Sequence, residues 1–327
     1  MESSLYPLKF KPVLKDKIWG GSRLRTLLNK DISEANRCGE SWEVSGLVGD
    51  ESVVANGFLA ENNLNELIEI YMTELVGEKI YEQYGLGFPL LIKFIDANDN
   101  LSVQVHPDDG LARRKYGQNG KTEMWHVIAA DPGGGLYVGF NRTVSKAQFE
   151  KAIADGTVEE TLRYYPVQPG DTFMIPAGTV HAIGKGVLLA EIQQPSDITF
   201  RVFDWNRVDD GGNPRELHVE EALEAIHFDE QPRDFKIHYP SQLNKTVKLV
   251  RSEYFNTNAL AFDRPIGKSF AEIDSFVLYI CLDGQILLAF GDRRERLETG
   301  EVVLIPADIE EVQLLPARPS KVLEVYC

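Results

Sequence analysis

The chain has 327 residues, about two domains at roughly 150 residues each, and its 43% hydrophobic and 26% charged residues exclude a disordered or fibrous protein. A formal charge of −16 makes nucleic acid and anionic membranes poor partners, since both bind basic surfaces. No apolar run approaches the roughly 20 residues of a membrane span, and the amino terminus has no apolar signal region. We therefore expect a cytoplasmic protein with no membrane partner.

The first predicted element is an amphipathic helix over residues 63–84, where apolar side chains recur at a 3.6-residue spacing that Gly77 interrupts. Short β-branched and aromatic runs, bounded by turn residues, then predict a series of strands between residues 89 and 205. Within this series, residues 145–165 have the signals of a helical pair that begins with a capping box at Ser145.

The sequence HVEEALEAIHF, which follows Pro214, predicts a third helix. Strands resume after it, and SFVLYICLDGQILLAF has the pattern of a hairpin with a two-residue turn at Asp283-Gly284. EVVLIPA, EVQLLPA and KVLEVYC complete the series. Because strands follow one another without βαβ alternation, we expect a mostly β fold of antiparallel sandwiches or jelly rolls with helical insertions.

One internal repeat supports two related halves. Residues 170–177 and 300–307 share the pattern Gly, acid, three residues, Ile-Pro-Ala. Extending the alignment places His181 opposite Glu311, so only the first half retains an imidazole at this position. The repeat predicts two copies of one β fold, of which the first carries the chemistry.

Four residues in the first half have the chemistry of a metal site. Gln104 and His106 project from one face of a strand, Glu123 lies in a β-prone run where a carboxylate is costly to bury alone, and His181 begins a later strand. Two imidazoles and a carboxylate bind Zn²⁺ or another first-row divalent ion, and they also fit non-haem iron. His126 has the opposite strand parity to Glu123, so we expect an ordinary packed histidine there.

These motifs resemble known families. GDTFMIPAGTVHAIG is similar to the second motif of the cupin superfamily, although Gln104 stands where the first motif has histidine and sixteen residues separate His106 from Glu123. QVHPDD, a downstream Lys-x-Glu and PAGTVHA together resemble the type I mannose-6-phosphate isomerases in their short bacterial form. The resemblance runs from IWGG through GESWEVS to QQPSDITFRVFDWNR, which ends at residue 207.

The resemblance implies two cupin-like domains: a catalytic one over residues 1–230, with amino-terminal and inserted helical segments, and a degenerate one over residues 240–327. It also implies one Zn²⁺ per chain, with other divalent first-row metals as options. The implied ligands are Gln104, His106, Glu123 and His181. Arg201 and Lys121 match the family's catalytic positions, and Lys93 and Ser102 match positions that bind the substrate phosphate.

The activity that the resemblance implies is the zinc-dependent interconversion of mannose 6-phosphate and fructose 6-phosphate through an enediolate. A metal ion and the Arg201 guanidinium are suited to stabilise that charge. The base stays open between metal-bound hydroxide, Lys121 and another carboxylate, and Arg201 could instead pair with Asp197 or Asp204. An iron-dependent cupin dioxygenase and a non-catalytic sugar-binding cupin are the alternatives. A sugar phosphate is the expected partner, of a monomer or a homodimer.

Overall fold

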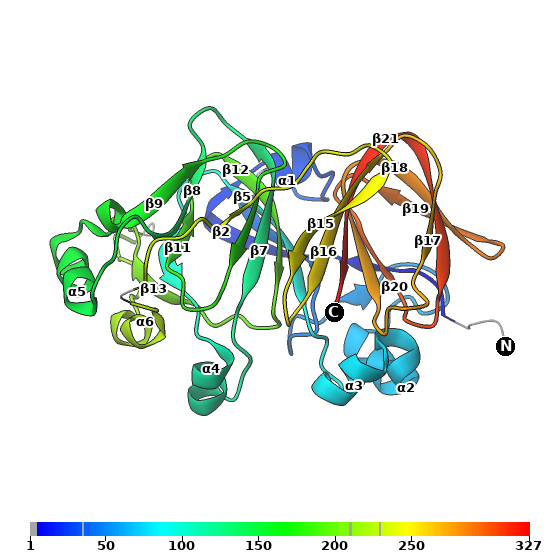
Figure 1. The fold of residues 1–327 in the computed structure, drawn as a ribbon, viewed down its shortest axis with the longest axis horizontal. Coiled ribbons are helices and arrows are strands. Elements are labelled where there is room, and N and C mark those ends of the chain that lie inside the picture. Colours follow the sequence, from blue (N-terminus) through cyan, green and yellow to red (C-terminus); the bar gives the residue numbers. More distant parts are fainter. Residues whose placement is uncertain (1–4, 35, 209–210, 229) are drawn as a thin grey trace.

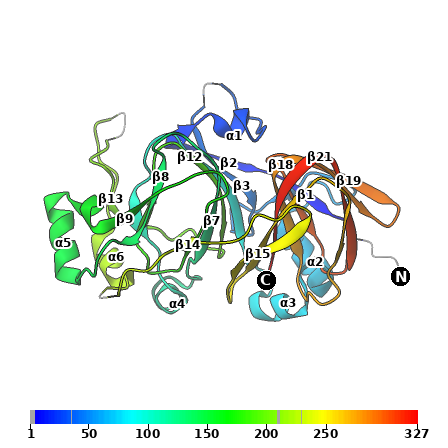
Figure 2. The same cartoon turned by 45° about the horizontal axis from the view of Figure 1, so that its top comes forward.

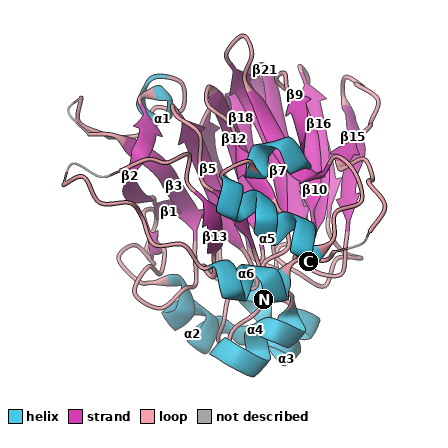
Figure 3. Ribbon diagram, turned by 90° about the vertical axis from the view of Figure 1, so that its left-hand side faces the viewer, coloured by secondary structure: helices cyan, strands magenta, loops and turns pink. Residues whose placement is uncertain are grey.

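The computed structural model describes residues 5–34, 36–208, 211–228 and 230–327. Antiparallel strands form two β units that lie side by side, and the helices gather mainly around their ends (Figure 1). Figure 3 shows how far strands dominate over helices. The expected mostly β fold is confirmed.

Two sheets build the first unit, and its strands curve around a ring in Figure 2. The seven-stranded sheet has the order β14 (Lys236–Ile237), β10 (Thr172–Ile175), β7 (Glu123–Ala130), β12 (Val187–Gln193), β5 (Leu91–Ala97), β2 (Val13–Gly21) and β3 (Cys38–Val44). The five-stranded sheet has the order β13 (Phe200–Phe203), β6 (Val103–Val105), β11 (His181–Ile183), β8 (Gly135–Phe140) and β9 (Leu162–Pro166). A shared apolar core that includes Trp125, Val138 and Phe173 lies between them.

A nine-stranded sheet builds the second unit. Its main order is β15 (Lys245–Arg251), β16 (Asn256–Phe262), β21 (Glu311–Tyr326), β18 (Val277–Phe290), β20 (Val302–Ile305), β1 (Leu8–Lys11) and β4 (Val53–Val54). β17 (Ile266–Ser269) pairs with β21, and β19 (Arg293–Glu298) pairs with β18. Strands β1 and β4 from the start of the chain therefore join the carboxy-terminal sheet, so backbone pairing crosses the division proposed at residues 230–240.

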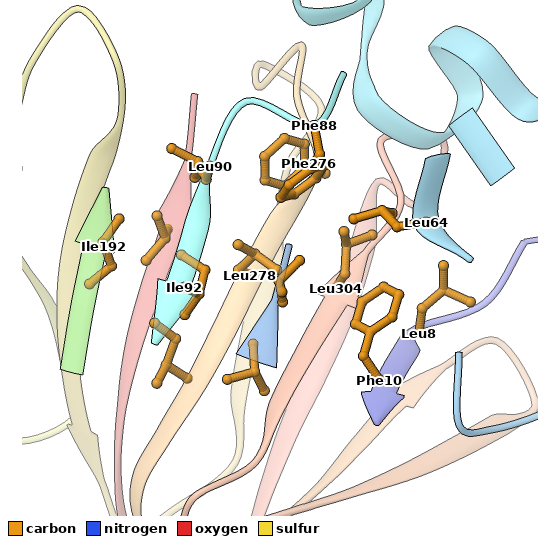
Figure 4. Packing of buried hydrophobic residues seen from close by; sticks show 14 of the residues in the cluster. Leu8, Phe10, Leu64, Phe88, Leu90, Ile92, Ile192, Phe276, Leu278 and Leu304 are labelled. Carbon is orange, nitrogen blue, oxygen red and sulfur yellow. The ribbon is translucent and has the colours of Figure 1, made fainter. Parts of the chain in front are cut away.

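The core of the second unit uses the same early residues. Leu8 and Phe10 of β1 pack beside Leu304 of β20, and Phe88 packs against Phe276 with the rings tilted and their centroids 4.6 Å apart (Figure 4). All five side chains are buried. Apolar burial therefore joins the two ends of the chain in one core.

The helices are short, and the described part of the chain has none that is long and apolar enough to span a membrane. They are α1 (Arg23–Thr26), α2 (Leu64–Val76), α3 (Glu78–Tyr84), α4 (Asp109–Tyr116), α5 (Lys146–Asp155), the 3₁₀ helix η1 (Val158–Thr161) and α6 (Val219–Ala225). Gly77, with φ of 93°, separates α2 from α3 as predicted, and Ser145 caps α5. The second half of the predicted helical pair is confirmed only as the single turn η1, because Leu162 and Tyr165 bury their side chains from strand β9.

The predicted hairpin at Asp283-Gly284 is also wrong. Strand β18 continues through these residues, and the irregular pairing is absorbed by register shifts against β21. Gly284, with φ of 124°, permits this bulge, since a Cβ there would lie 2.5 Å from the Ser320 Cβ. The hairpin turn lies instead at Gly291 and the residue after it, between β18 and β19.

The sequence repeat corresponds to repeated backbone geometry. Gly170 and Gly300 both have positive φ, 93° and 85°, and each precedes a four-residue strand. The carbonyl of Asp171 accepts from the Val127 amide at 2.8 Å, and that of Glu301 accepts from the Cys281 amide at 2.9 Å. The two β units therefore share the same turn and strand arrangement at this position.

Candidate active site

One row of the five-stranded sheet collects three of the predicted residues. On the paired strands β13, β6 and β11, Arg201 lies opposite Gln104, and Gln104 lies opposite His181. Residues that pair directly across antiparallel strands project from the same face of the sheet. The sheet register therefore directs these three side chains to one side.

The opposite sheet supplies the carboxylate. Glu123 begins β7, and His106 follows β6, so the two sheets bring their side chains together with His181. Candidate ligand atoms of His106, Glu123 and His181 all lie within 4.8 Å of one another, and all three residues are buried. The Nε2 atoms of His106 and His181 lie 3.4 and 3.3 Å from the two carboxylate oxygens of Glu123.

Hydrogen bonds to backbone carbonyls orient both imidazoles. His106 Nδ1 lies 2.8 Å from the Ile198 carbonyl, and His181 Nδ1 lies 2.8 Å from the Thr179 carbonyl. A carbonyl only accepts, so each Nδ1 carries the hydrogen and donates it. Each Nε2 is therefore left as a lone-pair donor that faces the Glu123 carboxylate, as metal-bound histidines are usually held.

The residues present fit a metal ion. Both Glu123 oxygens are buried, and neither accepts a hydrogen bond from the described residues. A buried carboxylate without such bonds carries a desolvation cost, which the charge of Lys121 at 3.5 Å offsets in part and a bound cation would offset further. The amide of Gln104 reaches the same place, with Nε2 3.3 Å from His181 Nε2. The set of two imidazoles, a carboxylate and an amide suits a first-row divalent ion.

The protonation states also suit a metal ion. Burial and the nearby Lys121 ammonium lower the pKa of His106 to about 3, and burial lowers that of His181. Burial alone would raise the pKa of Glu123, but the Lys121 ammonium and the two imidazoles hold it well below its usual range. At neutral pH the group is therefore two neutral imidazoles and one anionic carboxylate, the forms that bind metals.

Lys121 lies against this group and Arg201 lies at its edge. The Lys121 Nζ is 3.2 Å from His106 Nε2 and 3.5 Å from a Glu123 oxygen, and the side chain is buried. Arg201 is half-buried, donates to the Glu216 carbonyl at 2.7 Å, and leaves its buried Nε without a partner. Burial, followed by the charge of Arg215, lowers the pKa of Arg201.

The alternative role of Arg201 as a surface ion pair does not match the structure. Asp204 is bound by Arg207, at 2.6 Å, and by Arg215. No salt bridge joins Arg201 to Asp197 or Asp204 in the described part of the chain. Neither carboxylate therefore holds the Arg201 guanidinium, whose Nε has no partner among the described residues.

Lys93 and Ser102 do not contact the His106–Glu123–His181 group. The buried Lys93 ammonium lies 3.2 Å from a Glu191 oxygen and 3.8 Å from a Glu40 oxygen. Burial alone would lower the pKa of Lys93, but the charge of Glu191 raises it. Ser102 is buried just before β6, and its hydroxyl has no hydrogen-bond partner among the described residues.

Glu191 is a site-adjacent residue that the sequence predictions missed. It projects from β12 beside Lys93, and its other oxygen accepts from Trp125 Nε1 at 2.8 Å. Burial, followed by the charge of Glu123, raises its pKa. A single carboxylate in the apolar run VLLAEIQQ was the available signal, of the same kind that marked Glu123.

The fold and the buried group define a double-unit cupin whose first unit has a candidate metal site. Residues 7–130 match the family model of the phosphomannose isomerase type I catalytic domain. The chain is 36% identical to the mannose-6-phosphate isomerase of Streptococcus mutans, over 94% of both chains, and 36% identical to ManA of Bacillus subtilis, over 94% and 95%. A crystal structure of the Bacillus subtilis mannose 6-phosphate isomerase matches with a TM-score of 0.88 and 31% identity, over 98% of this chain and 99% of that one. The chain belongs to the type I phosphomannose isomerase family.

Proposed function

We propose that this chain is a zinc-dependent isomerase that interconverts mannose 6-phosphate and fructose 6-phosphate through an enediolate. The observation that carries the proposal is the buried group of His106, Glu123 and His181 with Lys121 beside it and Arg201 at its edge. The relatives named as mannose-6-phosphate isomerases over nearly the whole chain support the choice of substrate.

The proposed ligands of Zn²⁺ are Gln104, His106, Glu123 and His181. When bound, a divalent ion supplies a Lewis acid that polarises the sugar oxygens and stabilises negative charge. The two Nδ1–H bonds to the Ile198 and Thr179 carbonyls keep the imidazoles oriented toward that position. Zinc is proposed over iron on the family resemblance, since the donor set accepts both.

Two cationic side chains can stabilise the negative charge that develops in the proposed reaction. An enediolate is anionic, and a guanidinium that stays charged at any working pH stabilises it by hydrogen bonds and charge. Arg201 has an unpartnered buried Nε for this purpose, and Lys121 brings an ammonium into the same site. We assign both residues catalytic roles.

We assign the binding of the substrate phosphate to Lys93 and Ser102. In the structure Glu191 holds the Lys93 ammonium, so a phosphate dianion must compete with that carboxylate. In this proposal the protein acts in the cytoplasm on a small sugar phosphate, as a monomer or homodimer, with no nucleic acid or membrane partner.

The test is a coupled assay of mannose 6-phosphate conversion with and without a chelator, on the wild type, His181→Ala and Arg201→Ala. We expect chelation and His181→Ala to abolish turnover, and Arg201→Ala to lower kcat by roughly 10²- to 10³-fold. His126→Ala is the matched control, because His126 is also buried but bonds Thr172 on the other face of β7. It should leave metal content and kcat close to those of the wild type.

Turnover that survives both chelation and His181→Ala would refute the metal proposal. Elemental analysis identifies the metal that the purified protein carries. Oxygen consumption with iron, in the absence of isomerisation, would favour the dioxygenase alternative.

A further inference from the structure

The loop that carries Lys121 and leads to Glu123 belongs to no sheet ladder before residue 123. Residues 119–122 lie outside helices and strands, between α4 and β7. Glu123 itself pairs with Ile175 and Gln193, but Lys121 and the backbone that enters the strand have no such ladder to hold them. Some other contacts must hold this loop.

Asp109, in the first turn of α4, provides one contact. Its Oδ1 accepts from the Gly120 amide at 2.7 Å and from Gln194 Nε2 at 3.0 Å. One carboxylate oxygen therefore joins the loop to the segment that follows β12. The other oxygen accepts a longer bond of 3.4 Å from the Tyr254 hydroxyl, which belongs to the second β unit.

Gln194 provides the second contact. Its side-chain Oε1 accepts from the Thr122 backbone amide at 2.8 Å. Its backbone amide donates to the Thr122 carbonyl at 3.1 Å. Thr122 is the residue between Lys121 and Glu123, and its hydroxyl accepts from the Ala177 amide at 3.2 Å. Thr122 and Gln194 are both buried, so water does not compete for these bonds.

Backbone bonds complete the connection of the four segments that carry the site. The Lys121 amide donates to the Pro107 carbonyl at 3.1 Å, and the Gly178 amide donates to the His106 carbonyl at 2.9 Å. Hydrogen bonds thus connect the segments near residues 106, 121 and 177 in a closed circuit, and the segment at residue 194 joins this circuit through Thr122. The side chains of Asp109 and Gln194 reach the loop from other segments and bond the amides of Gly120 and Thr122.

We infer that Asp109 and Gln194 are positioning residues that hold the Lys121–Glu123 segment, and through it the metal-binding carboxylate, in place. The inference rests on the proposed metal site. Neither side chain touches the ligand atoms, so both act through Thr122 and Gly120. Removal of groups that orient a metal ligand typically lowers metal affinity or activity by about 10- to 100-fold.

The test compares Gln194→Ala and Asp109→Ala with Asp109→Asn. The asparagine side chain keeps one oxygen, which can still accept hydrogen bonds from Gly120 and Gln194. Zn²⁺ affinity is measured by competition with a chelator, and the visible spectrum of the Co²⁺-loaded protein reports ligand geometry. We expect the two alanine variants to bind Zn²⁺ about 10- to 100-fold more weakly with altered Co²⁺ spectra, and Asp109→Asn to remain within about threefold of the wild type.

Asp108→Ala is the matched control on the same helix. Asp108 caps α4 by accepting from the Leu111 amide at 2.7 Å, and among the described residues its carboxylate bonds neither Gly120 nor Gln194. Its loss should lower the melting temperature of the metal-free protein without changing Zn²⁺ affinity.

Equal loss of Zn²⁺ affinity in Asp108→Ala would overturn the inference, because helix stability would then explain the effect. Unchanged affinity and Co²⁺ spectra in both alanine variants would overturn it as well. A wild type that binds Zn²⁺ but does not isomerise mannose 6-phosphate would refute the proposed function and leave the positioning test valid, since the latter is read from metal affinity.

Discussion

At the scale of single residues, the site places a cation where a metal ion is expected. The Lys121 ammonium lies within 3.5 Å of both His106 and Glu123, so it competes electrostatically with any bound cation. We therefore expect Lys121 to have a role beyond structure. In the proposed mechanism that role is stabilisation of the enediolate.

This conflict predicts opposite effects on binding and catalysis in Lys121→Met, which keeps the length of the side chain and removes its charge. We expect Zn²⁺ affinity to rise by roughly tenfold, because the repulsion is lost, and kcat to fall by roughly 100-fold. Chelator competition and the coupled assay measure the two quantities. Weaker Zn²⁺ binding in this variant would show that Lys121 supports the ligands instead.

His126 gives a pH prediction away from the site. Burial lowers its pKa from 6.5 to about 4, so between these values the unfolded chain binds more protons than the folded one. Its contribution to stability is therefore complete above about pH 6.5 and is lost as the pH falls toward 4, by an amount on the order of a few kcal/mol. Urea unfolding of the wild type and His126→Gln should show a shallower pH dependence in the variant. Parallel slopes would contradict this assignment.

At the scale of elements, glycine explains why one turn prediction failed. Asp-Gly favours a two-residue hairpin turn when only local geometry is considered. At Gly284 the surrounding strands use the same positive φ for a bulge, which lets β18 continue against β21 and bury Ile286 and Leu288. Tertiary burial of a longer apolar strand outweighs the local turn preference.

Gly284→Ala is therefore expected to destabilise the protein by more than about 2 kcal/mol, through positive φ and contact with Ser320. Gly267→Ala in β17 is the control, since its Cβ would meet no atom within 4 Å. That change should stay within about 0.5 kcal/mol. Urea unfolding followed by circular dichroism measures both, and equal effects at the two positions would rule out the bulge explanation.

At the scale of the whole molecule, the two units diverge at the metal position. In the first unit, Ile175 of the Ile-Pro-Ala motif pairs with Glu123, and in the second unit the equivalent Ile305 pairs with Val277. The candidate ligand carboxylate is thus replaced by an apolar side chain. The described part of the second unit also has no group of three His, Cys, Asp or Glu residues close enough to share a metal ion.

Another carboxylate is retained in both units. Glu191 accepts from Trp125 at 2.8 Å in the first unit, and Glu324 accepts from the Tyr279 hydroxyl at 2.6 Å in the second. The paired strands place each carboxylate directly opposite its aromatic donor. The buried carboxylate with an aromatic partner is therefore a feature of both units, and the candidate metal group is specific to the first unit.

The second unit depends on the start of the chain. β1 pairs with β20, and the buried Lys30 ammonium donates to the Gly300 carbonyl at 2.6 Å. We predict that residues 240–327 alone show no cooperative unfolding transition, because this fragment lacks Leu8, Phe10 and their strand. Co-expression of residues 1–239 with the fragment should restore the transition, measured by circular dichroism in urea. A sharp transition of the isolated fragment would show that it folds independently.

The sequence by itself determined the fold class, the family, and the residue types of the site. Alternating β patterns, the Ile-Pro-Ala repeat and motifs such as QVHPDD are local, so they can be read without knowledge of distant contacts. Strand parity also separated His126 from Glu123, and the two residues do project to opposite faces of β7.

Only the tertiary structure decided which distant residues complete the site and the sheets. The pairing of β1 with β20, the contact of Glu191 with Lys93, and the bonds of Asp109 and Gln194 to the Lys121–Glu123 loop all join segments far apart in the chain. No local pattern specifies such partners, because they are selected by packing and by the need to satisfy buried polar groups once the sheets have formed.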